Sequence, residues 1–382
     1  MRISRIMALL APLLLLLASA SASWQLDLSP ARCVSAIMIE PTSGLILYEK
    51  EADLPRAPAS IAKLMLELVV LERVDSGEIR LDEPIRVSAW ASKIGGSQVY
   101  LAEGEAFTLE ELLKAVVISS ANDACVAVAE HVAGSAEGFV DLMNARAREL
   151  GLANTSYINV HGLDDEPGQG NVTTARDIAA IARHLVEMSH VLEWSSIEED
   201  YFRGGTFKLD NTNKLLGQYQ GLDGLKTGYT RKAGFCLCAT AQRGGMRLIT
   251  VVLGAESNRL RFQESARLLS AGFSQLRKSV LLAGGQPVPG GVPIMGGRKT
   301  RVEAVAAAPL AVVLPRRVDP PRTVLVPARG LRAPIQRGDT VGVVEARLEE
   351  GGVVSVPVVA AAEVKRATIF QTIARALGGG RS

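Results

Sequence analysis

The sequence predicts an α+β domain, in which an antiparallel sheet carries a cluster of helices, followed by a small all-β domain and an amphipathic tail helix. Strand-like segments at residues 34–50 and 233–254 enclose a stretch of helical pattern, so N-terminal and C-terminal segments are expected to close one sheet. From about residue 280, Gly, Pro and Val dominate and helical periodicity disappears. It returns after residue 364, where apolar residues recur at helical spacing.

Local signals predict the elements of the first domain. Residues 34–40 and 45–50 are strand-like and are joined by Pro41-Thr42-Ser43-Gly44, which indicates a hairpin. Thr108 and Glu111 have the spacing of a capping box and open a helix. The other predicted elements are helices at 60–74, 136–150, 174–188 and 259–270, and a strand pair at 233–242 and 246–254.

The second domain is expected at residues 280–364, because short Val-rich runs alternate there with turn residues. The predicted strands are 301–305, 311–315, 323–327, 340–348 and 353–359. The first domain is then assigned to residues 23–279.

Both ends of the chain carry targeting patterns. Two arginines precede an apolar run from Ile6 to Ala18 and a stretch of small residues, which is typical of a cleaved secretory signal over residues 1–22. The run is shorter than the ~20 residues that cross a bilayer, and the alternative is an uncleaved anchor. Residues 365–382 combine one apolar stripe with Lys and Arg, as in a helix lying in a membrane surface. The alternative is an ordinary helix docked on the protein.

Composition excludes several classes of function. The chain has 382 residues with 42 Lys+Arg against 40 Asp+Glu, a formal charge of +2, and 4% aromatics, so no nucleic-acid partner is expected. No Gly-rich phosphate loop is present. The four histidines lack metal-ligand spacing, so neither a metal nor a cofactor is expected. Cys33, Cys125, Cys236 and Cys238 are interpreted as buried free thiols.

The first motif with chemical potential is Ser60-Ile61-Ala62-Lys63, at the start of the predicted helix 60–74, where hydroxyl and amine share one face. A serine hydroxyl is a poor nucleophile until a base takes its proton. A lysine serves as that base only if burial or a nearby cation lowers its pKa, and the apolar sequence around Lys63 favours burial. The spacing also fits a serine that merely caps a helix.

The second motif is Ser120-Ala121-Asn122, on a short connector after the capped helix. A hydroxyl and an amide at such a place relay a proton and hold a substrate amide. The alternative is a second helix cap, because Ser and Asn both suit that position.

The third motif is Lys226-Thr227-Gly228, expected at the start of a strand-like run. Lys and Thr offer a cation and a hydroxyl to a carboxylate, and Gly lets another backbone come close. The alternative is a strand-entry turn.

Together, and in this order, the three motifs match the Ser-x-x-Lys, Ser-x-Asn and Lys-Thr-Gly set of penicillin-binding proteins and serine β-lactamases. The chain resembles the low-molecular-weight D-alanyl-D-alanine carboxypeptidases of the penicillin-binding protein 5 type. Residues 335–364 resemble the C-terminal β-domain of that family, and the tail resembles its membrane anchor. The segments that carry the resemblance in the first domain are 57–66, 119–130, 159–163, 173–180 and 221–241.

The resemblance implies a serine β-lactamase/transpeptidase-like domain that cleaves the terminal D-alanine from peptidoglycan stem peptides. Ser60 is then the nucleophile, and Lys63 the base for its acylation. Ser120 and Asn122 carry the proton path and position the substrate.

The resemblance also implies a binding site for the substrate's terminal carboxylate. Lys226 and Thr227 of Lys226-Thr227-Gly228 bind that carboxylate, and the backbone N–H groups of Ser60 and Tyr229 form the oxyanion hole. β-Lactam antibiotics are expected to acylate Ser60. The implied location is the periplasmic face of the inner membrane, with peripheral attachment through the tail.

Some features leave alternatives open. Ala62 stands where the family more often has Thr, and the loop Asp164–Asn171 contains Glu166, interpreted as a solvated loop charge. A DD-endopeptidase on the same fold is one rival, although such relatives usually lack the second domain. A β-lactamase would leave the C-terminal third unused. A β-lactam-binding sensor or structural cell-wall protein without turnover is the alternative from another class.

Overall fold

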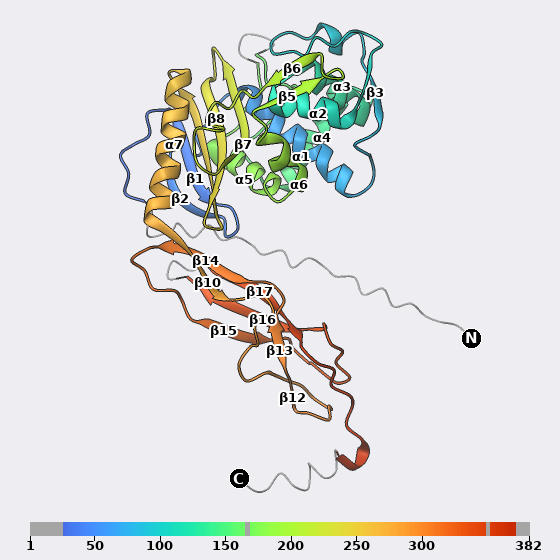
Figure 1. Ribbon diagram of the computed structural model, residues 1–382, viewed down its shortest axis with the longest axis vertical. Coiled ribbons are helices and arrows are strands. Elements are labelled where there is room, and N and C mark those ends of the chain that lie inside the picture. The colour runs from blue at the N-terminus through green and yellow to red at the C-terminus, as the bar shows by residue number, and fades with distance from the viewer. Residues whose placement is uncertain (1–25, 165–168, 349–351, 372–382) are drawn as a thin grey trace, which may run out of the picture. The chain divides into compact units, whose positions relative to one another are not determined.

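The computed structural model describes residues 26–164, 169–348 and 352–371 (Figure 1). The signal segment expected at 1–22, Glu166 and most of the predicted tail helix lie outside the described residues. Within them the chain divides into two units. One consists of residues 26–286 and 308–320, and the other of residues 287–307 and 321–371. The sequence expectation had set a single boundary after residue 279.

A five-stranded antiparallel sheet organises the first unit, with strand order β2-β1-β9-β8-β7. N-terminal and C-terminal strands meet at its centre, which confirms the predicted closure. Strand β7 lies at one edge. The strands are β1 (Ser35–Glu40), β2 (Leu45–Lys50), β7 (Leu222–Thr230), β8 (Gly234–Arg243) and β9 (Met246–Ala255).

Helices cover both faces of this sheet, α7 on one side and the cluster α1 to α6 on the other (Figure 1). The helices are α1 (Lys63–Asp75), α2 (Leu109–Ile118), α3 (Asn122–Ala133), α4 (Ala136–Glu149), α5 (Ala175–Leu185), α6 (Ser189–Ser195) and α7 (Asn258–Gln275). Two 3-10 turns, Ala59–Ala62 and Ala91–Lys93, and two small strand pairs complete the unit: β3 (Pro84–Arg86) with β4 (Ala106–Thr108), and β5 (Glu199–Phe202) with β6 (Phe207–Asp210). The α+β prediction is confirmed.

Strand alternation explains how one sheet serves two cores. In β9, Ile249 and Val251 join the core with the helical cluster, whereas Leu248 and Val252 join the core beneath α7. Cys236 and Cys238 both face the helical cluster, as their spacing predicts. All four cysteines are buried and unpaired with one another.

Helix α1 runs through the interior of the helical cluster. Every residue from Lys63 to Leu71 is buried, because the helix is apolar on nearly all sides and has no surface face in its first half. This placement draws Lys63 and Glu67, the charged residues of that stretch, into the core.

The second unit is all-β, as predicted. Its main sheet has the antiparallel order β13-β17-β16-β15, accompanied by the pair β11-β12. The strands are β11 (Val292–Pro293), β12 (Arg301–Val302), β13 (Ala304–Ala306), β15 (Thr323–Pro327), β16 (Thr340–Arg347) and β17 (Val353–Ala360). Among the described residues, no helix is both long and apolar enough to cross a membrane.

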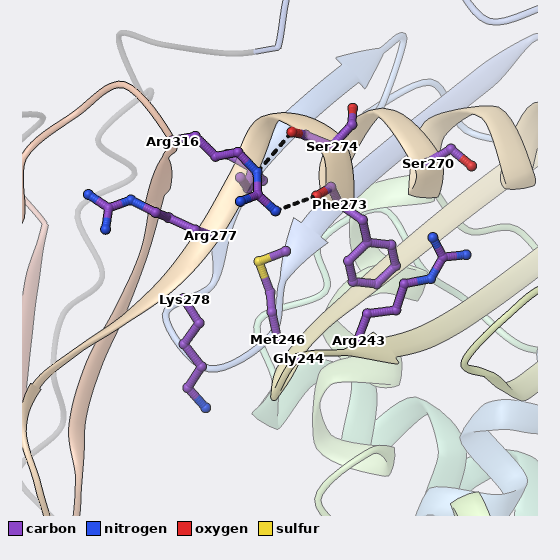
Figure 2. A pocket seen from close by; sticks show the side chains of 10 residues that line it. Arg243, Gly244, Met246, Ser270, Phe273, Ser274, Arg277, Lys278 and Arg316 are labelled. Carbon is purple, nitrogen blue, oxygen red and sulfur yellow. Dashed lines mark hydrogen bonds between the residues drawn. The ribbon is translucent and has the colours of Figure 1, made fainter.

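Residues 308–320 belong to the first unit because they attach to the end of α7. Strand β14 (Leu310–Pro315) pairs with β10 (Leu276–Leu282), a strand that the sequence pattern did not predict. Arg316 donates hydrogen bonds through Nε to the Ser274 carbonyl (3.0 Å) and through Nη2 to the Phe273 carbonyl (3.3 Å; Figure 2). The last carbonyls of a helix lack partners within it, and a cation suits them.

Beside this contact lies a hollow of about 430 Å³, lined among others by Arg243, Arg277, Lys278 and Arg316 (Figure 2). Each of these four cations donates a hydrogen bond to a backbone carbonyl. None of the three sequence motifs contributes to this hollow.

The predicted capping box is present and supplies the first test. The Thr108 hydroxyl accepts from the Glu111 backbone N–H (3.2 Å), and the Glu111 carboxylate accepts from the Thr108 N–H (2.9 Å). We expect Thr108→Ala to reduce the free energy of unfolding by about 1 kcal/mol, because α2 loses its N-cap. Urea unfolding followed by circular dichroism measures the change. Ser76→Ala removes only an exposed hydrogen bond to Arg73 and serves as control; equal losses in both variants would contradict the capping role.

Candidate active site

Ser60 lies in the 3-10 turn Ala59–Ala62 that leads into α1. The prediction that Ser60 begins the α-helix was wrong by three residues, since α1 begins at Lys63. Ala59 adopts a left-handed conformation (φ 49°) directly before Ser60, where the tight turn starts. The turn leaves the Ser60 side chain half-buried, whereas its neighbours on both sides are buried.

The Lys63 ammonium position is fixed by three oxygen atoms. Its Nζ lies 3.0 Å from Ser60 Oγ, 2.7 Å from Asn122 Oδ1 and 2.9 Å from the His161 carbonyl. An ammonium donates to all three. A neutral amine donates to the amide and the carbonyl and keeps one lone pair, which then faces the Ser60 hydroxyl. The geometry therefore fits lysine in both protonation states and suits proton transfer with Ser60.

Burial sets the proton affinity of Lys63. The side chain is fully buried, and desolvation lowers its pKa from the usual 10.5 to about 8. The Glu67 and Asp123 carboxylates oppose this decrease. A substantial fraction of Lys63 is thus neutral near pH 8, which a general base requires.

The connector between α2 and α3 delivers the second motif to Lys63. The Asn122 amide accepts from Lys63 through Oδ1 and donates through Nδ2 to the Gly95 carbonyl (2.6 Å). Ser120 sits in a left-handed conformation (φ 62°), and its buried Oγ has no hydrogen-bond partner among the described residues. Asn122 is therefore held in place, whereas the Ser120 hydroxyl remains available to a substrate or a water molecule.

The third motif lies in the middle of β7, so the prediction that it starts a strand was wrong. Pairing with β8 extends from Leu222 to Thr230, which also excludes the alternative of a strand-entry turn. Lys226 is buried, and desolvation, with Lys63 and Arg261 nearby, lowers its pKa. The Thr227 hydroxyl donates to Thr212 Oγ1 at 2.7 Å, and Tyr229 is 55% exposed.

Gly228 brings β7 against the turn that carries Ser60. A Cβ atom added at Gly228 would lie 2.9 Å from the Pro58 carbonyl oxygen and 3.1 Å from the Ile61 nitrogen. Only glycine permits this approach of two backbones. The backbone of Ser60 and that of Tyr229, the next residue along β7, are consequently brought to one place, as an oxyanion hole requires.

The sequence reasoning assigned no role to several groups at this site. Arg261 of α7 donates to the carbonyls of Gly228 (2.9 Å) and Cys236 (3.1 Å), and so fixes the strand pair next to the motif. The backbone carbonyls of Gly95 and His161 hold Asn122 and Lys63. Such partners have no local signal, because backbone carbonyls carry no residue identity.

Glu67 was also missed, although its spacing from Lys63 was readable. It stands four residues after Lys63 in an apolar helix, so both side chains lie on the same face. A buried carboxylate at that spacing was a detectable signal.

These contacts define a class of protein. A serine activated by a buried lysine, beside a strand edge that offers Lys and Thr, is the arrangement of the active-site-serine acyl-transfer enzymes that penicillin acylates.

Comparison with known proteins identifies the family. The family model described as D-alanyl-D-alanine carboxypeptidase matches residues 24–257, and that of the penicillin-binding protein 5 C-terminal domain matches residues 278–366. The chain belongs to this D-alanyl-D-alanine carboxypeptidase family, which confirms the resemblance inferred from the motifs.

Three relatives illustrate the similarity. D-alanyl-D-alanine carboxypeptidase DacF of Bacillus subtilis is 36% identical, covering 90% of this chain and 89% of the relative. DacC of Escherichia coli is 35% identical, covering 87% of this chain and 84% of the relative. The crystal structure of a peptidoglycan synthesis regulatory factor (PBP3) from Streptococcus pneumoniae has a TM-score of 0.80 at 29% identity, covering 88% of this chain and 100% of that one.

The contact of Gly162 with the Ser60 turn generates the second prediction. Gly162 has φ +85°, and a Cβ added there would clash with the carbonyl group of Ala59. We expect Gly162→Ala to displace the His161 carbonyl from Lys63 and to slow acylation by penicillin about 100-fold. Stopped-flow or gel labelling with a fluorescent penicillin measures the rate.

Gly151→Ala is the matched control. Gly151 also has positive φ (+71°), but nothing lies within 4 Å of the added Cβ. This variant should lose about 1 kcal/mol of stability through backbone strain and still acylate at the wild-type rate. Equal acylation rates in the two variants would show that the Gly162 contact does not position the site.

Proposed function

We infer that the chain is a serine-type D-Ala-D-Ala carboxypeptidase. It removes the terminal D-alanine from peptidoglycan stem pentapeptides through an acyl-enzyme on Ser60, and β-lactams inhibit it. The observation that carries this inference is the 3.0 Å contact between Ser60 Oγ and the buried amine of Lys63. Membership of the family supports the substrate class.

The chemistry follows from the contacts of Lys63. Neutral Lys63 takes the Ser60 proton while Ser60 Oγ attacks the carbonyl between the two D-alanines. The backbone N–H groups of Ser60 and Tyr229 stabilise the resulting oxyanion, a contribution of a few kcal/mol for each such donor. The C–N bond then breaks, and the leaving amine receives the proton. Water hydrolyses the ester, which frees Ser60 and the shortened peptide.

Strand β7 provides the binding edge. An edge strand leaves backbone N–H and C=O groups unpaired, so an extended peptide can lie beside residues 226–229 as an added strand. Protonated Lys226 and the Thr227 hydroxyl, both buried at this edge, then bind the terminal carboxylate. This arrangement favours substrates that end in a free carboxylate, and thus a carboxypeptidase over an endopeptidase.

The proposal of an enzyme rather than a sensor without turnover is supported by the completeness of the site. Ser60, Lys63, Asn122 and Lys226 are all buried or half-buried within one region, and none of these groups is replaced by an inert side chain. A sensor needs only the acylation half of the reaction.

Substitution of the nucleophile tests the function. We expect Ser60→Ala to abolish labelling by penicillin and to reduce release of D-alanine from a D-Ala-D-Ala-terminated peptide by about 10³-fold or more, because no other hydroxyl replaces Ser60 Oγ. Mass spectrometry of the labelled wild-type protein should place the adduct on Ser60. Ser119→Ala removes the serine next to Ser120 in the sequence and should keep both penicillin labelling and D-alanine release. An adduct on another residue would overturn the function, and labelling of Ser60 without D-alanine release would favour the sensor.

We also propose export to the periplasmic face of the inner membrane and peripheral attachment through residues 365–382. The charged and apolar pattern of residues 1–22 supports export. Near the end of the described residues, Ile369 and Phe370 are 77% and 85% exposed and begin the apolar stripe of the tail. Large apolar side chains left exposed in this way favour contact with a membrane surface.

Truncation after Thr368 tests the attachment. This cut keeps the bridges Ile335–Val364 and Gly297–Arg366 of the second unit. We expect the truncated protein to move from the membrane to the soluble fraction, with unchanged D-alanine release, because the apolar stripe is lost while the first unit is intact. Phe370→Glu in the full chain should weaken membrane binding in the same direction. Unchanged fractionation of both variants would rule out an anchor.

A further inference from the structure

Glu67 is a buried carboxylate for which the reaction as described has no use. It lies on α1 and is only 3% exposed. Its Oε1 atom has no hydrogen-bond partner among the described residues. A buried, unpartnered carboxylate is unfavourable, and its presence calls for a physical explanation.

The surroundings of Glu67 supply one. Charged and titratable groups approach it from four elements: Lys63 on α1, Cys125 on α3, Lys226 on β7 and Cys238 on β8. All four are at most 1% exposed. The two thiols are held neutral by burial, which raises the pKa of each. The charges that face Glu67 are therefore those of two lysines, neither in direct ion-pair contact with it within the described part of the chain.

The proposed function sets a specific charge requirement on these lysines. Lys63 must be neutral to accept the Ser60 proton, and Lys226 must be protonated to bind the terminal carboxylate. Two buried ammonium groups repel each other, and burial disfavours any net charge. When Glu67 is ionised, one of the lysines neutral and the other protonated, the net charge of the three side chains is zero.

We propose that Glu67 is a positioning residue that neutralises the buried charge behind the active site, so that neutral Lys63 and protonated Lys226 coexist. This inference rests on the proposed function. Among the described residues the carboxylate makes no hydrogen bond with Ser60, and it acts through the two lysines, one of which, Lys63, lies on the same face of α1.

Burial lowers the pKa of both lysines, and the Glu67 carboxylate raises both. Two other charges act on these lysines: Asp123 raises the pKa of Lys63, and Arg261 lowers that of Lys226. Burial raises the pKa of Glu67 to about 7, a rise that the two lysines partly offset, so Glu67 is mostly ionised above that pH. The three groups titrate as one cluster, so removal of one charge displaces the others.

The pH dependence of acylation tests the proposal. In the wild type, the rate constant for acylation by penicillin should rise and then fall as pH increases, because the reaction needs Lys63 neutral and Lys226 protonated at the same time. Glu67→Gln keeps the shape of the side chain but removes its charge. Both the rising limb and the falling limb of this pH profile should then move to lower pH, by about one pH unit, because both lysines hold their protons less tightly.

The terminal carboxylate of the substrate separates the two limbs. A peptide ending in D-alanine amide has no carboxylate for Lys226, so only the Lys63 limb should respond to Glu67→Gln with this substrate. For the peptide ending in D-alanine, KM should also rise several-fold on the alkaline side, because less Lys226 is protonated. A purely structural role would lower kcat in both substrates without displacing either limb.

Two control variants complete the design. Thr250→Val removes a buried, unpartnered hydroxyl on the opposite face of the sheet, beneath α7, and should leave both limbs in place. Glu67→Asp keeps the charge, so the two limbs of its pH profile should match those of the wild type even if its maximal rate is lower. If Glu67→Gln does not fold, Glu67→Asp still decides, since displaced limbs in that variant overturn the proposal.

The outcomes distinguish this inference from the function on which it rests. Coincident pH profiles of Glu67→Gln and wild type, with penicillin still attached to Ser60, would overturn the role of Glu67 and leave the carboxypeptidase intact. Loss of the Ser60 adduct from the wild-type protein would overturn both.

Discussion

The burial of the Lys63 amine is the constraint on which the rest of the site depends. An ammonium removed from water is stable only where oxygen atoms replace its hydration, and here they come from Ser60, Asn122 and the His161 carbonyl. These partners lie in three separate segments of the chain. The Lys63 amine therefore gains all three hydrogen bonds only once the sheet and the helical cluster enclose α1. The same burial lowers the pKa of Lys63, as the role of base proposed for it requires. Stability and reactivity thus have one physical origin.

Sequence signals predicted the parts of this site better than their assembly. The capping box at Thr108, the hairpin at residues 34–50 and the apolar environment of Lys63 depend on neighbours within a few residues, and the structure has all three. The contact between Lys63 and Asn122 spans 59 residues of sequence, and no periodic pattern of residues predicts it. Strand β10 was missed because its partner β14 lies beyond a long intervening segment. The third motif was expected at the start of a strand, whereas β7 begins four residues before Lys226, because pairing with β8 extends to Leu222.

Two glycines show why the site needs contacts that no side chain makes. Gly228 lets the edge strand lie against the Ser60 turn, and Gly162 lets the loop that carries the His161 carbonyl reach the same turn from another direction. Backbone N–H groups stabilise an oxyanion only if they are held at fixed positions before the reaction, because any reorganisation during the reaction reduces their effect. Close backbone packing supplies that rigidity. The side chains of Ser60 and Lys63 carry the proposed chemistry, and the close packing of these backbones holds the groups in place for it.

In the mechanism proposed above, substrate binding changes the charge around Lys63, and the buried Glu67 carboxylate takes part in that change. Before binding, ionised Glu67 and protonated Lys226 balance, and Lys63 holds its proton weakly. The terminal carboxylate of the peptide then adds a negative charge next to Lys226 and excludes water from the edge of β7. The region now carries one net negative charge, which favours a proton on Lys63. In the proposed mechanism, a Lys63 that is neutral when the substrate arrives therefore accepts the Ser60 proton more readily. Without Glu67, the arriving carboxylate would only neutralise the charge of Lys226, and the pKa of Lys63 would rise less.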